Sequence, residues 1–194
     1  MKLVSIEEAV DFLKLDKVVA IPTETVYGLA ANAFSETAVS RVFETKGRPS
    51  YNPLIVHIAE HERLADLVST FPDNAKILAD KFWPGPLTLL LPKSNRVSDR
   101  ITAGKSTVAI RMPSHPIAQD LLKKLDFPLV APSANRFKHI SPTKPSHVFD
   151  SLGADTPIID GGECKLGLES TIVGFDTHNT PVVYRQGTIS LESL

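Results

Sequence analysis

Short apolar runs rich in valine, isoleucine and leucine recur along this chain, and many of them end at a proline. Runs of this length are too short for core helices, and their β-branched content favours buried strands. Proline is tolerated at the ends of strands, so these prolines mark strand boundaries. Strands are therefore predicted at residues 17–22, 54–58, 86–91, 107–111, 128–132, 157–160, 170–175 and 181–185.

Helical patterns fill the intervals between these runs. Ser5 and Glu8 form a capping box at the start of one helix, and Ser35 can cap a second helix that stops at Gly47. The alternation of strands and helices, without an internal repeat, predicts one α/β or α+β domain over residues 1–194 with a single mixed sheet. The predicted helices cover residues 5–15, 35–46, 60–69, 74–83, 114–125 and 144–152.

Composition narrows the classes of function. The 194 residues carry a formal net charge of −1, unlike a protein that coats nucleic acid, although a local basic cleft is compatible with that charge. The single cysteine, Cys164, excludes an internal disulfide and a cysteine-based metal cluster. No apolar segment is long enough to span a bilayer, and the N-terminus lacks a signal-peptide pattern. We therefore expect a cytoplasmic protein without a membrane partner.

Polar side chains gather where the predicted strands end. In sheets of this class, loops at the strand ends bring distant residues into one ligand-binding crevice. Cationic and hydroxyl side chains together suit a polyphosphate. No nucleophile–base pair stands out, so the expected chemistry is positioning and charge neutralisation. The residues concerned are Thr23-Glu24-Thr25, Lys46, Arg48, Asn52, His57, Arg111, Ser133, Asn135, Glu169-Ser170-Thr171 and Arg185.

Each of these residues also has an ordinary structural interpretation. Lys46 and Arg48 can interact with the C-terminal dipole of the helix that precedes them. His57, alone in an apolar strand, is more typical of a hydrogen-bonded core residue than of a ligand contact. Ser133 and Asn135 are common turn residues. Spacing alone therefore predicts an anion-binding α/β domain and nothing narrower.

Two motif matches fail on their structural context. Residues 57–61 match the H-x-x-E-H pattern of zinc hydrolases, which needs both histidines on one helix face, but His57 belongs to a predicted strand. Residues 104–107, Gly-Lys-Ser-Thr, resemble the end of a phosphate-binding P-loop. There, Asp99 stands where the first glycine is needed, and a strand follows instead of a helix. No protein side chain is therefore predicted to bind a metal.

Seven segments of the chain form a specific combination when they are taken in order. They are PTETVYGLAANA, KGRPSYNPLIVHI, FWPGPLTLLL, STVAIRMPSHPIA, PLVAPSAN, SPT and GLESTIV. Together they resemble the YrdC/TsaC family of threonylcarbamoyl-AMP synthases over about residues 5–188. The resemblance implies a YrdC-like twisted mixed β-sheet with flanking helices around a concave, positively lined cleft.

The resemblance also implies a reaction. A nucleotidyltransferase of this family condenses L-threonine with bicarbonate to N-carboxy-threonine, whose carboxylate attacks the α-phosphate of ATP and releases pyrophosphate. ATP is thus a substrate, and Mg²⁺ is expected on its phosphates, held mainly by the nucleotide. The product, threonylcarbamoyl-adenylate, passes to the enzyme complex that modifies A37 of tRNAs reading ANN codons.

Individual positions match the motifs of the family. Lys46 and Arg48 correspond to its K-x-R, and Ser133 and Asn135 correspond to its S-x-N, a tetrad expected to be catalytic. Lys46 and Arg48 can neutralise the leaving pyrophosphate. Arg111 can pair with a carboxylate of threonine. The resemblance implies ATP contacts for Arg48, Asn52, Thr107, Ser133, Ser141 and Arg185, and threonine contacts for Thr25, His57, Arg111, Ala131 and Thr171.

The chain departs from the family pattern in three places. Phe137-Lys138 stands where a Ser-Gly pair follows S-x-N, so the loop that leads to Ser141 can differ in shape. Residues 185–187 read Arg-Gln-Gly in place of Arg-Pro-Gly. Some members continue into a linker and a second domain, so we expect any lid here to come from a partner or to be absent. Two other functions stay open: an RNA-binding module using the same concave surface, and a paralogous carbamoyl-transfer enzyme.

Overall fold

The computed structural model describes residues 1–194, and its centre is one ten-stranded mixed sheet. The strands lie in the order β1-β8-β2-β3-β7-β4-β6-β5-β9-β10. This confirms the predicted α/β class with a single mixed sheet. The strands are β1 (Lys2–Leu3), β2 (Val19–Ile21), β3 (Gly28–Asn32), β4 (Ile55–His57), β5 (Leu87–Pro92), β6 (Thr107–Arg111), β7 (Leu129–Val130), β8 (Pro157–Ile158), β9 (Thr171–Phe175) and β10 (Pro181–Arg185).

Two of the helices that connect these strands start as their capping residues predict, whereas the helix predicted from residue 114 is capped by His115. Ser5 Oγ accepts the amide N–H of Glu8, and the Glu8 carboxylate accepts that of Ser5, so the capping box forms. Ser35 caps the next helix, which ends at Gly47 in the left-handed conformation. The helices are α1 (Ile6–Lys14), α2 (Glu36–Lys46), α3 (Leu64–Leu67), α4 (Asp73–Phe82), α5 (Asp99–Thr102), α6 (Pro116–Lys123) and α7 (Pro145–Leu152), with 3₁₀ turns at His61–Arg63 and Leu191–Ser193.

Strand β3 lies within the sheet although the sequence patterns predict no strand there. Its sequence, GLAAN, is rich in residues with weak strand preference, which explains the error. Small residues are needed because β3 passes close to the segment after β7. A Cβ on Gly28 would lie 3.1 Å from the Cβ of Ala131. Strand β1 and helix α5 were also missed, and the helix predicted at residues 60–69 is divided into a 3₁₀ turn and α3.

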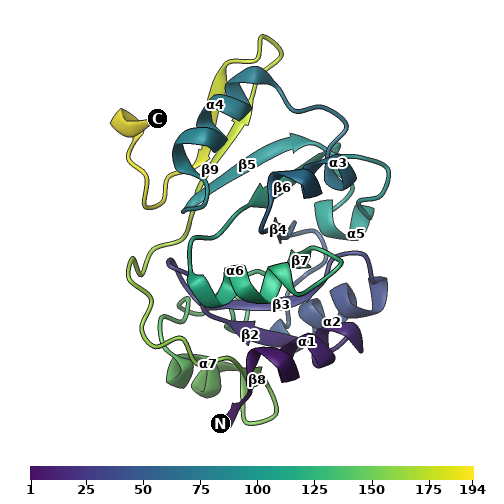
Figure 1. Ribbon diagram of the computed structural model, residues 1–194, viewed down its shortest axis with the longest axis vertical. Coiled ribbons are helices and arrows are strands. Elements are labelled where there is room, and N and C mark those ends of the chain that lie inside the picture. Colours follow the sequence, from purple (N-terminus) through teal and green to yellow (C-terminus); the bar gives the residue numbers. More distant parts are fainter.

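Buried apolar side chains form clusters on both faces of the sheet. Helices α1 and α6 pack on one face, where Val19 and Ile21 point, whereas Ala20, Leu29 and Ala31 point to the other face and its larger cluster. In Figure 1, α1, α2 and β8 lie towards the N-terminus at one end of the molecule, and α4, β5 and β9 lie at the other end, near the C-terminus. No helix combines the length and the apolar character needed to cross a lipid bilayer.

The candidate site lies on the same face of the sheet as α1 and α6. Cross-strand partners point to the same face of a sheet. His57 of β4 is paired with Leu129 of β7, which belongs to the apolar cluster under these helices, and also with Arg111 of β6. The face that α1 and α6 cover over β2, β3 and β7 therefore continues over β4 and β6, where it lines a cavity.

Candidate functional site

A cavity of about 730 Å³ lies over the continuation of this face. Alternate residues of the strands form its floor, among them Ile55 of β4 and Ala109 of β6, which are cross-strand partners. Loops at the strand ends supply its walls. The charged side chains that line the cavity are four cations and one carboxylate: Arg48, Lys105, Arg111, Arg185 and Glu169.

Arg111 is held in a buried ion pair with Glu24. Its Nη2 donates to Glu24 Oε1 at 2.6 Å, and the side chains of Arg111 and Glu24 are only 5% and 8% exposed. Arg111 Nη1 donates to Thr25 Oγ1 at 2.9 Å, and the other oxygen of Glu24 accepts the amide of Ser114 at 3.1 Å. Because both charges are hydrogen-bonded on several sides, this network holds the guanidinium in one orientation at the cavity wall.

His57 lies beside this pair, as the cross-strand partner of Arg111. Burial, followed in importance by the nearby charge of Arg111, lowers the pKa of His57 to about 3. The imidazole is therefore neutral at physiological pH. Its Nδ1 lies 3.3 Å from the carbonyl oxygen of Ile55. When Nδ1–H donates to this carbonyl, Nε2 is the acceptor for a hydroxyl or amine of a ligand.

Arg185 belongs to the second ion pair of the cavity. Its Nη1 donates to Glu169 Oε2, and its Nε and Nη2 donate to the carbonyl and the hydroxyl of Ser170, each at 3.0 Å. Ser141 Oγ donates to the other oxygen of Glu169 at 3.0 Å. The side chains of Arg185 and Glu169 are 34% and 38% exposed, so water reaches this pair far more than the first.

Lys46 and Asn135 shape the loop that carries Ser133 to the cavity, and neither side chain lines the cavity itself. Lys46 is 2% exposed, and its Nζ donates to the carbonyl of Ser133 and, at 2.5 Å, to that of Asn135. The Asn135 amide group donates to two further carbonyls of the same loop, at 2.7 and 2.8 Å. Burial and then the charge of Arg48 lower the pKa of Lys46 to about 7.

Eight of the residues predicted for the site line this cavity, and Asn52, Ser141 and Thr171 lie outside its lining, as do Lys46 and Asn135. Asn52 presents its carbonyl to Arg48 Nε at 3.4 Å, and Ser141 contacts Glu169, so both touch lining residues. The hydroxyl of Thr171 holds the turn after β10, because it accepts two backbone amides and donates to a carbonyl there. The predicted residues that line the cavity are Thr25, Arg48, His57, Thr107, Arg111, Ala131, Ser133 and Arg185.

Glu24 and Glu169 are functional candidates whose roles the sequence does not predict, although both stand at the ends of predicted strands. A signal was available, because an acidic side chain beside a buried strand needs a partner. The partner itself cannot be found from local spacing: Arg111 is 87 residues away from Glu24, and Arg185 is 16 residues from Glu169.

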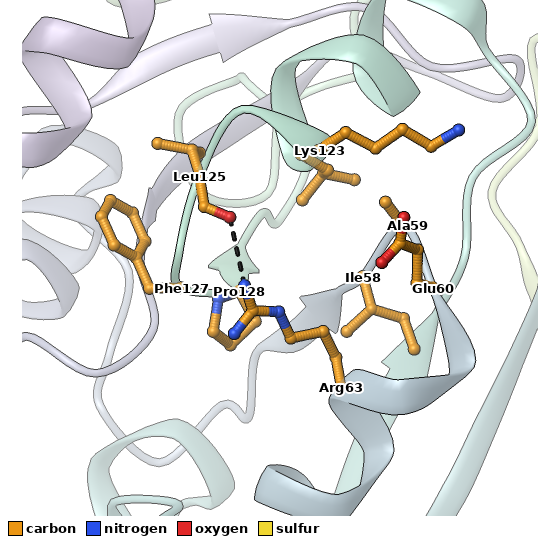
Figure 2. Close-up of a pocket in the computed structure, with 9 residues that line it drawn as sticks. Ile58, Ala59, Glu60, Arg63, Lys123, Leu125, Phe127 and Pro128 are labelled. Carbon is orange, nitrogen blue, oxygen red and sulfur yellow. Dashed lines mark hydrogen bonds between the residues drawn. The ribbon is translucent and has the colours of Figure 1, made fainter.

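A second, much smaller hollow lies between the segment that follows β4 and the C-terminal end of α6 (Figure 2). Its volume of about 30 Å³ has room for about one water molecule, and Arg63 reaches across it to donate to the carbonyl of Leu125 at 3.3 Å. Glu60, the glutamate of the H-x-x-E-H pattern, lines this hollow. His57 of that pattern lines the large cavity, whereas His61 packs edge-on against Trp83. The two histidines therefore have different surroundings.

A protein-family model described as Sua5_yciO_yrdC, Telomere recombination, matches residues 11–187. The chain belongs to the Sua5/YciO/YrdC family. Threonylcarbamoyl-AMP synthase of Pyrococcus abyssi is 51% identical over 96% of this chain, and that of Bacillus subtilis is 49% identical over 97%. This chain spans about half the length of these two relatives, 55% in each case. It covers 87% of a putative threonylcarbamoyl-AMP synthase of Mycobacterium tuberculosis, at 34% identity.

Solved structures of the family have the same fold. P. abyssi Sua5 complexed with L-threonine matches with a TM-score of 0.93 and 48% identity, over 98% of this chain and 58% of that one. E. coli YciO matches with a TM-score of 0.83 over 97% of this chain and 91% of that one. At 24% identity, the second likeness supports the fold alone.

Proposed function

We propose that this chain is a threonylcarbamoyl-AMP synthase, which converts L-threonine, bicarbonate and ATP into threonylcarbamoyl-adenylate and pyrophosphate. The observation that carries the proposal is a single cavity onto which Arg48, Arg111 and Arg185 all open. Its volume of about 730 Å³ lies within the range of small-molecule sites. The names of the P. abyssi and B. subtilis relatives and the threonine complex of P. abyssi Sua5 support the same function.

Threonine is proposed to bind beside Arg111. Three of the five N–H groups of this guanidinium donate within the protein, so two remain for a carboxylate. Neutral His57 can accept a hydrogen bond from the threonine hydroxyl or amine. A site that binds this hydroxyl rejects an apolar analogue such as valine, because its own polar groups would then be left unpaired. Thr25 and Ala131 complete the proposed contacts.

ATP is proposed to place its phosphates near Arg48, Ser133 and Arg185. The carboxylate of N-carboxy-threonine attacks the α-phosphorus, an acyl–phosphate bond forms, and the bond to the β-phosphate oxygen breaks as pyrophosphate leaves. Arginine side chains directed at the phosphates lower the energy of the charge that develops on the leaving group. Lys46 and Asn135 hold the loop of Ser133. Further nucleotide contacts are proposed for Asn52, Thr107 and Ser141, and a supporting role in the turn after β10 for Thr171.

Magnesium is proposed to arrive with the nucleotide and not to occupy a site built from protein ligands. Glu169 is the one carboxylate that lines the cavity, and it is bound to Arg185. This donor set fits a metal that is held mainly by phosphate oxygens and water. When bound, the metal would neutralise part of the phosphate charge.

The adenylate is a mixed anhydride and hydrolyses readily, so the proposal includes a partner that consumes it. Following the family resemblance, this partner is the complex that modifies A37 of tRNA, and the site of action is the cytoplasm. The proposed unit for the synthase step is residues 1–194.

The test is pyrophosphate release from the purified chain with ATP, Mg²⁺ and bicarbonate. Release is expected only when L-threonine is present, and the labile adenylate or its AMP should be detectable by mass spectrometry. Pyrophosphate release that does not depend on threonine would contradict the proposal, as would the absence of release.

Arg48→Ala tests the site. The side chain of Arg48 donates only to carbonyls of the turn that follows it, so its loss should leave the fold intact. The rate should fall about 100-fold or more, the usual effect of removing one charge-stabilising donor. Arg100→Ala is the matched control, because Arg100 is exposed and lies outside the cavity lining.

A further inference from the structure

Glu169 occupies an unexpected position among the proposed phosphate contacts. It is the only carboxylate among the residues that line the cavity. One of its oxygens binds to Arg185 and the other accepts the hydroxyl of Ser141, and both partners are proposed ATP contacts. An acidic side chain in a site for a polyanion opposes binding, unless it holds a metal or gives way.

The charge of Glu169 acts on three cations in and around the cavity. Burial lowers the pKa of Lys46, Arg48 and Arg185, and the charge of Glu169 opposes this lowering in each case. Two of these three cations, Arg48 and Arg185, line the cavity and are proposed phosphate contacts. A carboxylate placed among them resembles a bound phosphate oxygen in charge and in hydrogen-bonding capacity.

A ligand can also replace Glu169 in its contact with Arg185. The side chain of Glu169 is 38% exposed and that of Arg185 is 34% exposed, and ion pairs with this access to water contribute little to stability. Arg185 stays in place without Glu169, because it also donates to the carbonyl and hydroxyl of Ser170 at 3.0 Å. A phosphate group with more charge than a carboxylate can therefore replace Glu169 without disturbing the arginine.

We propose that Glu169 is an internal competitor for the phosphate-binding residues. It occupies Arg185 and Ser141 when the cavity is empty, leaves them when a polyphosphate binds, and returns as pyrophosphate departs. It thereby weakens pyrophosphate binding and favours release of the product. This role rests on the proposed function, which supplies both the phosphate contacts at Arg185 and Ser141 and pyrophosphate as the ligand.

The experiment is calorimetric titration of the whole chain with inorganic pyrophosphate in EDTA, comparing the wild type with Glu169→Gln. Glutamine keeps the size of the side chain and an acceptor for Ser141, and it removes only the charge. We expect Glu169→Gln to bind pyrophosphate about 10-fold more tightly, and the gain to shrink as salt is added. Glu169→Ala should show a gain of the same sign.

Glu163→Gln is the matched control. Glu163 also pairs with a cation, Lys144 at 3.3 Å, but both side chains are exposed and neither lines the cavity. Its pyrophosphate affinity should equal that of the wild type. If Glu169→Gln binds pyrophosphate no more tightly than the wild type, the competitor role is wrong.

A titration with magnesium pyrophosphate tests the opposite role. If Glu169 were a metal ligand, Glu169→Gln would bind magnesium pyrophosphate more weakly than the wild type, which would also overturn the proposal. The outcome is separable from the proposed function. A threonine-dependent synthase without the affinity gain refutes only the competitor, whereas the gain without synthase activity refutes only the reaction.

Discussion

The same cavity contains two glutamate–arginine pairs that differ in their access to water. Glu24–Arg111 is buried, at 8% and 5% exposure, whereas Glu169–Arg185 is about one-third exposed on both sides. They lie near each other, since Ser170, which binds Arg185, also hydrogen-bonds to Thr88, the cross-strand partner of Arg111. The chemistry of the two pairs is identical, and their surroundings differ.

Burial decides what each pair can do. In the first pair, both ions are buried away from water, and removal of either one leaves the other charge unpaired in the interior. Arg111 is therefore a fixed feature of the cavity wall. In the second pair, water can replace either partner at little cost, so Arg185 can exchange Glu169 for a ligand. One cavity thus combines a rigid arginine, proposed to bind the carboxylate of threonine, with an exchangeable arginine, proposed to bind phosphate.

The largest difference between the pairs should appear in stability. Glu24→Ala leaves Arg111 buried without its counter-ion, so we expect the free energy of unfolding to fall by about 3–5 kcal/mol. Urea denaturation at pH 7 measures it, with Glu163→Ala as the exposed control. A loss below about 1 kcal/mol would mean that the buried pair is no more important to the fold than a surface pair.

Arg185→Ala should instead impair catalysis with little effect on the fold. We expect threonine-dependent pyrophosphate release to fall about 100-fold, equivalent to about 2.7 kcal/mol, because the proposed phosphate contact is lost. The free energy of unfolding should change by about 1 kcal/mol or less, since Arg185 is partly solvated. The measurements are the release assay and urea denaturation, with Arg100→Ala as the control. An unfolded variant would show that the second pair is structural after all.

Lowering the pH should destabilise the folded protein, because His57 beside the buried pair resists protonation in the fold. The ordinary pKa of histidine is 6.5, and burial beside Arg111 lowers that of His57 to about 3. Between these values the unfolded chain binds a proton that the folded chain does not, so stability present above pH 6.5 is lost as pH falls. From pH 6 to 4.5 the contribution of His57 is about 2 kcal/mol.

Comparison of the wild type with His57→Asn isolates this contribution, because the other titrating groups are common to both. Urea denaturation at pH 6 and 4.5 should show a smaller loss of unfolding free energy for the variant. Equal losses in the two proteins would indicate that the pKa of His57 is the same in the folded and the unfolded chain, so that burial beside Arg111 does not lower it.

The smallest effect is expected for Glu169→Gln on stability. The side chain is partly exposed, and glutamine can still accept the hydrogen bond from Ser141. We therefore expect the free energy of unfolding to stay within about 1 kcal/mol of the wild type. Thermal or urea denaturation provides the measurement. A loss as large as that of Glu24→Ala would remove the distinction between the two pairs.

The fold was largely predictable where local patterns are strong. The runs that became β5, β6, β9 and β10 and the capping box at Ser5 were predicted from hydrophobic pattern and capping residues alone. Strand β3 was not predicted, because glycine and alanine have a weak preference for strands. Small residues are needed there because the strand passes close to Ala131. The prediction failed where tertiary packing overrides propensity.

The sequence by itself determined the class of the fold and the set of cationic and hydroxyl groups at the strand ends, because both follow from local residue order. Only the tertiary structure decided which glutamate forms an ion pair with each arginine, and how far each pair is buried. Lys46 shows the same limit: its role in neutralising pyrophosphate stays a prediction, and only the structure reveals that its Nζ donates to the carbonyls of Ser133 and Asn135. Burial and long-range pairing arise from the packing of distant segments, and residue spacing alone contains neither.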